Sequence, residues 1–301
     1  MSSAVSPGGV IPAVGATAEG LLLVGHGSRS SEGAAEMLAI ARLVAAALPE
    51  VAVDVGFLEM TDPPAGPVLD GLAAAGCGRV VVLPLVLLGA GHAKSDVPAL
   101  VLEGRRRHPD LDVHFGSPLG ISRDLVGLLG GALTAAGGQG LPLLLIARGT
   151  SDPDANGDAH KVARLLAEWV GAPFVHTAFT GVTDPLVPAG LEVFARLGYD
   201  HMAVAFWFLC TGVLVERARV EIAAFTAATG VEVVDAGNLG PDPGVVPAIL
   251  ERYEEAVRGL PAVNCDLCAY RAPWPGREQR LGQPIGVGHS HLAAEHRHAG
   301  P

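Results

Sequence analysis

The sequence predicts an α/β protein built from two tandem flavodoxin-like, chelatase-type domains, each with a parallel four-stranded sheet. Short apolar segments alternate with longer Ala-rich segments along most of the chain. The apolar segments are too continuous for burial on one face, which is typical of parallel strands covered by helices on both sides. This alternation then occurs a second time, so the two domains are expected to be related by internal duplication.

One constant offset relates the two halves. Residues 21–28, Leu-Leu-Leu-Val-Gly-His-Gly-Ser, align with residues 143–150, Leu-Leu-Leu-Ile-Ala-Arg-Gly-Thr, at an offset of 148 − 26 = 122. Thr-Asp-Pro at 61–63 aligns with Thr-Asp-Pro at 183–185 at the same offset. Because separated blocks share a single offset, we interpret the second half as a copy of the first.

The first copy is expected to contain four strands and four helices. Strands are predicted near 21–25, 51–57, 79–86 and 111–115, and helices near 31–47, 65–75, 95–107 and 121–135. The second copy repeats this order from about 143 to 258, after a Gly-rich linker at 137–140. The expected organisation is a flexible N-terminus (1–19), a catalytic domain (20–138), a degenerate domain (139–260) and a flexible tail (261–301).

Charge and hydropathy exclude several partners. The formal net charge is −11, whereas binding to nucleic acid requires clustered Lys and Arg, so no nucleic acid partner is expected. The longest apolar run, residues 80–88, is too short to cross a bilayer, and residues 1–20 lack the features of a signal peptide. We therefore expect a cytoplasmic protein with no membrane partner.

Three chemically active side chains follow the strands of the first copy only. His26, Glu59 and His92 come after the first, second and third strands, and carboxyl ends of parallel strands meet at one edge of a sheet. At the offset of 122 their counterparts are Arg148, Gly181 and Leu214. This asymmetry predicts one site, made by the first copy. Asp96 is expected to be a helix N-cap.

Three segments resemble the class II chelatases of the sirohydrochlorin type, and in particular the long-form cobaltochelatases of the CbiX family. They are Leu-Leu-Val-Gly-His-Gly-Ser-Arg (22–29), Phe-Leu-Glu (57–59) and Leu-Gly-Ala-Gly-His-Ala-Lys-Ser-Asp-Val-Pro (88–98). The resemblance implies ATP-independent insertion of a divalent metal into sirohydrochlorin, in the cobalamin or sirohaem route. It also implies that a monomer is functional, because short relatives pair two chains to build what this chain carries once.

The resemblance assigns metal binding and proton acceptance to His26 and His92, with Glu59 assisting. Metal insertion releases two pyrrole protons, and neutral imidazole both accepts protons and binds Co²⁺ or Fe²⁺. The substrate also carries many carboxylates. The side chains expected to receive them are Ser28, Arg29, Lys94 and Arg148.

The tail carries further candidate ligands. Cys265 and Cys268 form a CxxC pair that resembles a segment associated with an iron–sulfur centre in some relatives, although a four-iron cluster is usually held by four cysteines. His289 and His291 belong to a sparse His-rich tract that either handles metal or is a polar terminus.

Two alternatives to a cobaltochelatase stay open. The main one is an iron-specific chelatase for sirohaem synthesis, because His and carboxylate ligands accept both metals. A non-enzymatic metal chaperone would explain the tail, but it would not explain why the three polar residues are confined to one copy.

Overall fold

The structure, a computed structural model, describes residues 18–28 and 30–259. Its first sheet contains β1 (Ala18–Gly25), β2 (Val51–Phe57), β3 (Cys77–Pro84) and β4 (Asp112–Phe115), in the order β2-β1-β3-β4. The second sheet contains β5 (Leu143–Ala147), β6 (Val175–Phe179), β7 (His201–Phe206) and β8 (Glu232–Asp235), in the order β6-β5-β7-β8. All pairings are parallel, which confirms the predicted fold class.

The helices repeat in the same order in both halves. The first half contains α1 (Ser31–Ala47), α2 (Ala65–Ala74), a π-helical turn η1 (His92–Asp96), α3 (Val97–Arg107) and α4 (Arg123–Ala135). The second half contains α5 (Pro153–Val170), α6 (Val187–Arg196), α7 (Val213–Thr229), a short 3-10 turn η2 (Pro243–Val245) and α8 (Val246–Val257). The N-caps also correspond, since Ser30 caps α1 and Asp152 caps α5, and 152 − 30 = 122.

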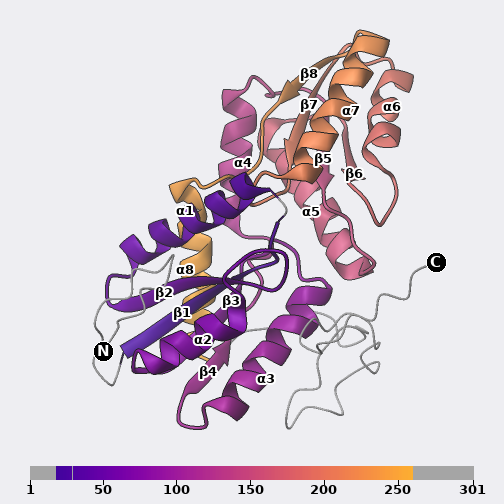
Figure 1. The fold of residues 1–301 in the computed structure, drawn as a ribbon. Helices are drawn as coiled ribbons and strands as arrows, with labels where there is room; N and C mark the ends of the chain where they lie inside the picture. Colours follow the sequence, from indigo (N-terminus) through magenta and orange to yellow (C-terminus); the bar gives the residue numbers. More distant parts are fainter. Residues whose placement is uncertain (1–17, 29, 260–301) are drawn as a thin grey trace, which may run out of the picture.

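The last helix of each half lies on the other half. Helix α4 packs against α5 and β7, whereas α8 packs against α1, β3 and β4 (Figure 1). Gly130 on α4 permits this approach, because a Cβ there would lie 2.6 Å from Cδ1 of Trp169 on α5. On the other side, Nδ1 of His114 lies 3.1 Å from the carbonyl oxygen of Ala256. The sequence alone does not predict this exchange.

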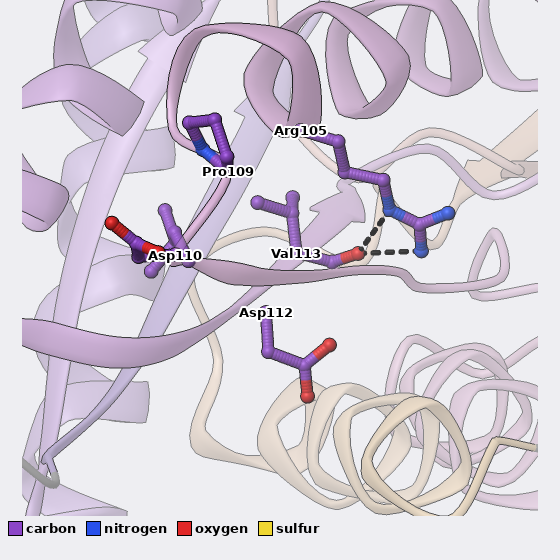
Figure 2. A pocket seen from close by; sticks show the side chains of 6 residues that line it. Arg105, Pro109, Asp110, Asp112 and Val113 are labelled. Carbon is purple, nitrogen blue, oxygen red and sulfur yellow. Dashed lines mark hydrogen bonds between the residues drawn. The ribbon is translucent and has the colours of Figure 1, made fainter.

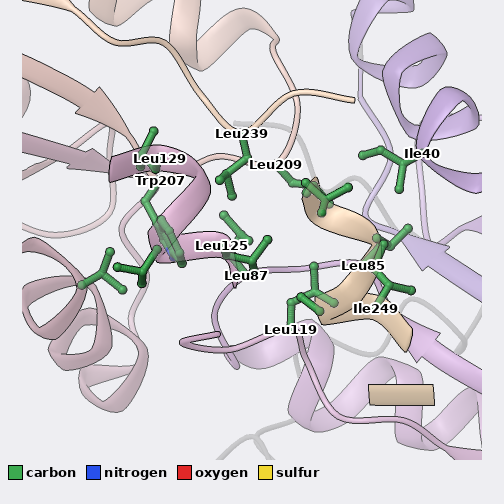
Figure 3. Close-up of a cluster of buried hydrophobic side chains, with 14 of the residues drawn as sticks. Ile40, Leu85, Leu87, Leu119, Leu125, Leu129, Trp207, Leu209, Leu239 and Ile249 are labelled. Atoms are coloured by element: carbon green, nitrogen blue, oxygen red, sulfur yellow. The ribbon is translucent and has the colours of Figure 1, made fainter. Parts of the chain in front are cut away.

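The exchange produces one hydrophobic core that is shared by both halves. It combines the inner faces of the two sheets with the apolar faces of α1, α4, α5 and α8. Figure 3 shows part of this core, which brings together Leu85 and Leu87 from the first half, Leu125 of α4, and Trp207 and Leu209 from the second half. Smaller clusters cover the outer face of each sheet. The shared core fixes the relative orientation of the two halves, and therefore the shape of the space between them.

Among the helices of residues 18–259, none combines the length and the apolar character that crossing a membrane requires.

Candidate active site

The three residues singled out at the strand ends converge. His26 directly follows β1, Glu59 lies just after β2, and His92 opens η1 after β3. Potential ligand atoms of the three side chains all lie within 4.8 Å of one another. The centroids of the two imidazole rings are 4.2 Å apart. The parallel sheet explains this convergence, because its strands all end at the same edge.

Gly27 allows the loops that follow β1 and β2 to touch. Its φ of +100° favours glycine, and a Cβ there would lie only 1.7 Å from the carbonyl oxygen of Glu59. The backbone N–H of Glu59 donates to the carbonyl of His26 at 3.1 Å. Any side chain at position 27 would therefore push Glu59 away from His26.

His26 and Glu59 form a close polar pair. Nδ1 of His26 lies 3.1 Å from Oε1 of Glu59, although the two groups are not aligned as a hydrogen bond. Burial lowers the pKa of His26 below its usual value, and the neighbouring His92 lowers it further, while Glu59 acts in the opposite direction. The net direction favours the neutral imidazole, which is the form that binds a metal or accepts a proton.

Asp96 stands at the N-cap position of α3, as expected, but its side chain does not cap the helix and instead orients His92. Oδ2 of Asp96 lies 2.6 Å from Nδ1 of His92, and the Asp96 side chain is fully buried. It makes no hydrogen bond to the first turn of α3. The carboxylate favours the tautomer that is protonated at Nδ1, which makes Nε2 the basic nitrogen of the ring. A carboxylate behind a metal-binding histidine is a common arrangement, and π-helical turns often occur at functional sites.

A cavity of about 820 Å³ lies between the two halves, with His26 and His92 in its wall. Of the residues expected to receive substrate carboxylates, Ser28 lines it from the first half and Arg148 lines it from the second. The Arg148 side chain is exposed. The Ser28 hydroxyl accepts a hydrogen bond from the backbone N–H of Ser30 at 3.0 Å. The cavity is large enough for a ligand of several rings.

The expectation that Lys94 contacts substrate is wrong for this structure. Its side chain is only 1% exposed, and Nζ lies 2.7 Å from Oδ2 of Asp152 and 2.9 Å from Oδ2 of Asp154. Both aspartates belong to the start of α5, so Lys94 joins the segment that carries His92 to the second half. The buried ammonium is neutralised within the protein and does not line the cavity.

Several candidates lie outside the described residues. They are Arg29, Cys265, Cys268, His289 and His291.

A second, smaller hollow of about 400 Å³ lies at the opposite end of the first sheet, near the start of β4 (Figure 2). Arg105 directs Nε and Nη2 to the backbone carbonyl of Val113, at 2.8 and 2.6 Å. The lining of this hollow includes the carboxylates of Asp110 and Asp112 but no histidine or cysteine. This composition offers no group that titrates near neutral pH, so the hollow is a weaker candidate.

Sequence reasoning missed the roles of Asp96, Asp152 and Asp154. For Asp96 a signal existed, because His92 and Asp96 are four residues apart and such side chains meet on one helical face. For the partners of Lys94 no local signal existed, since Asp152 is 58 residues away.

Comparisons with known proteins agree with this geometry. The CbiX family model matches residues 20–136 and 142–256. The chain is 34% identical over 258 residues to "Sirohydrochlorin cobaltochelatase" of Priestia megaterium, covering 83% of this chain and 84% of that protein. It is 29% identical over 242 residues to "Sirohydrochlorin ferrochelatase" of Bacillus subtilis strain 168, covering 79% and 91%.

Solved structures with the same fold were determined with either metal. "SirB from Bacillus subtilis with Fe3+" superposes with a TM-score of 0.72 at 28% identity, covering 81% of this chain and 97% of that one. SirB of Bacillus subtilis subspecies spizizenii in complex with cobalt gives 0.69 at 26% identity, with the same coverage. A duplicated parallel α/β fold, with one His-Glu-His cluster among the residues that the structure describes, therefore defines an enzyme of the class II chelatases. Within that class, the chain belongs to the CbiX family.

Proposed function

We propose that this protein inserts Co²⁺ into sirohydrochlorin without ATP, as a step toward cobalamin. The observation that carries the proposal is the cluster of His26, Glu59 and His92, whose ligand atoms lie within 4.8 Å of one another in the wall of an 820 Å³ cavity. Cobalt and iron are substrates of such a site. All three side chains of the cluster come from one chain, which supports a functional monomer.

The two histidines supply the metal ligands in this proposal. The lowered pKa of His26 favours its neutral form, and the Asp96 carboxylate favours the His92 tautomer whose Nε2 is basic. Imidazole nitrogen is a suitable ligand for both Co²⁺ and Fe²⁺. With ring centroids 4.2 Å apart, the histidines can present one ion together.

The same groups remove the pyrrole protons. Metal insertion releases two protons from the macrocycle, and each requires a base nearby. Glu59 lies beside His26 and can accept one proton, from His26 or from the macrocycle. Nε2 of His92 can accept the other once the metal has moved to the macrocycle, and the Asp96 carboxylate at Nδ1 stabilises the resulting imidazolium. Arg148 and Ser28, which line the same cavity, are the described groups best placed to meet substrate carboxylates.

The choice of cobalt rests on sequence identity to relatives. The relative with 34% identity is a cobaltochelatase, whereas the ferrochelatases of two Bacillus-type bacteria are 29% identical. Iron insertion for sirohaem is therefore the alternative. A cluster at Cys265 and Cys268, and metal handling by His289 and His291, stay predictions.

Anaerobic mixing of the purified protein with sirohydrochlorin and either Co²⁺ or Fe²⁺ tests the proposal through the absorbance change of the macrocycle. We expect faster metallation than in protein-free solution with both metals, and a higher kcat/KM with Co²⁺. A higher kcat/KM with Fe²⁺ would identify the iron enzyme instead. No acceleration with either metal would reject chelatase activity on this substrate.

A further inference from the structure

Two rare turns occupy equivalent places in the two halves. Met60 has a φ of 58°, and the N–H of Thr61 donates to the carbonyl of Glu59 at 2.7 Å. Val182 has a φ of 70°, and the N–H of Thr183 donates to the carbonyl of Gly181 at 2.9 Å. A hydrogen bond across one residue with positive φ defines the classic γ-turn, which is uncommon and strained.

The residues at the centres of these turns are unfavourable choices for the backbone. Glycine, asparagine or aspartate adopt positive φ most readily, whereas a β-branched residue there is an outlier. Burial of the side chain does not compensate for the strain of either turn, since Met60 is 54% exposed and Val182 is 69% exposed. Local folding therefore favours neither residue, and an exposed apolar group in a strained turn indicates a use for the side chain.

Both side chains line the active-site cavity, one from each half. Their positions correspond in the duplication, because 182 − 60 = 122. The turns are held from behind by two glycines: a Cβ on Gly27 would lie 1.7 Å from the carbonyl oxygen of Glu59, and one on Gly149 would lie 2.1 Å from that of Gly181. The backbone at each turn is therefore fixed by its neighbours, which limits the positions that the apolar side chain can take.

We propose that Met60 and Val182 form a pair of apolar contacts that hold the tetrapyrrole ring between the two halves of the protein. This inference rests on the proposed function. A tetrapyrrole has apolar ring faces and a charged rim, so polar groups such as Arg148 suit its edge while apolar side chains suit its faces. The histidine cluster of the first half has no counterpart in the second, but the apolar turn does. The second half thus retains ring binding after losing the metal ligands.

The test compares matched valines. Val182→Ala keeps a Cβ in the turn and removes two methyl groups, and Val220→Ala makes the same change on α7 at a residue that is also 69% exposed but does not line the cavity. Binding of metal-free sirohydrochlorin is measured by quenching of its fluorescence. We expect the Kd to rise about tenfold for Val182→Ala and for Met60→Ala, and about a hundredfold for the double variant, because apolar contact is lost.

Four companion measurements separate ring binding from damage to the fold. Val220→Ala should bind the ring as the wild type does, and Val182→Ile, which keeps the apolar bulk, should also stay close to the wild type. The Kd of the protein for Co²⁺ alone should not change in Val182→Ala. The thermal midpoint of Val182→Gly should be equal to or higher than that of the wild type, because glycine adopts the positive φ of this turn without strain.

The outcomes distinguish this inference from the proposed function. Wild-type binding of sirohydrochlorin in the Val182→Ala, Met60→Ala double variant would overturn the ring contact while leaving the chelatase proposal intact. If the wild type instead binds uroporphyrin but not sirohydrochlorin, and the variants weaken that binding, the ring contact stands and the proposed substrate fails. Binding of neither tetrapyrrole by the wild type would reject both.

Discussion

Nδ1 of His92 lies 2.6 Å from Oδ2 of Asp96, and the aspartate is completely shielded from solvent. Only one turn of π-helix separates the two residues, so their geometry is set locally. The pair connects a side chain in the cavity wall to a buried charge that solvent cannot screen. The behaviour of His92 in metal binding is therefore expected to depend on a residue that never meets the substrate.

Asp96→Asn is expected to lower Co²⁺ affinity and kcat/KM by about ten- to a hundredfold, because the buried negative charge behind the imidazole is lost. Metal affinity is measured by calorimetry and turnover by absorbance. Asp54→Asn is the control, since Asp54 is also buried but lies within β2 and outside the cavity lining. Equal losses in the two variants would indicate general damage to the first half.

His26→Ala and His92→Ala are each expected to reduce the metallation rate at least about a hundredfold, the scale typical of lost acid–base catalysis. Arg148 occupies the equivalent of position 26 in the second half. Arg148→Ala should therefore mainly raise the KM for the tetrapyrrole. The measurement is the steady-state rate at saturating and limiting substrate. Similar losses of kcat in all three variants would contradict a site confined to the first copy.

The pKa of His26 in the metal-free protein is expected to lie below 6.5, because burial and then the adjacent His92 disfavour the imidazolium. Co²⁺ binding should consequently persist below pH 6.5 and be lost as the pH falls through the lowered pKa. Because its pKa is lowered, His26 takes up a proton at a lower pH in the folded state than in the unfolded state. Its contribution to stability therefore declines as the pH falls below 6.5.

An NMR titration of the histidine ring protons measures this pKa directly. His92→Gln removes one of the two main causes and should raise the midpoint of His26, but only in part, because desolvation is the larger cause. A midpoint at or above 6.5 in the wild type would show that Glu59 dominates the site instead.

Lys94→Met is expected to reduce the free energy of unfolding by about 3 kcal/mol, since it removes the buried ammonium that pairs with the buried carboxylate of Asp152. Chemical denaturation gives this value. The matched control is Lys161→Met, which breaks the pair of Lys161 with Asp158 where the lysine is 64% exposed, and should cost less than about 1 kcal/mol. A small effect at Lys94 would mean that its ion pairs with the start of α5 add little to the stability of the folded protein.

Much of the fold was accessible from the sequence because its signals are local and repeated. Continuous apolar runs such as residues 21–25 mark buried strands, and the offset of 122 carries the assignment from one half to the other. The convergence of His26, Glu59 and His92 followed from one rule, that parallel strands present their carboxyl ends at one edge.

The rest depended on contacts between residues far apart in the chain. Local sequence does not predict that α4 and α8 each pack on the other half, because an apolar helix face does not specify which sheet will cover it. The position of Lys94 beside His92 in the sequence predicts a substrate ligand, but in the folded protein two carboxylates from the start of α5 pair with it. The γ-turns at Met60 and Val182 left no signal either, since both residues are poor choices for positive φ.

By itself, the sequence determined the duplication, the order of strands and helices, and the single edge where the active side chains meet, because periodicity and strand direction are properties of the chain. Only the tertiary structure decided which helix covers which sheet, which charges are neutralised internally and which side chains face the cavity. Those outcomes depend on long-range packing and desolvation, which are determined only when both halves are assembled.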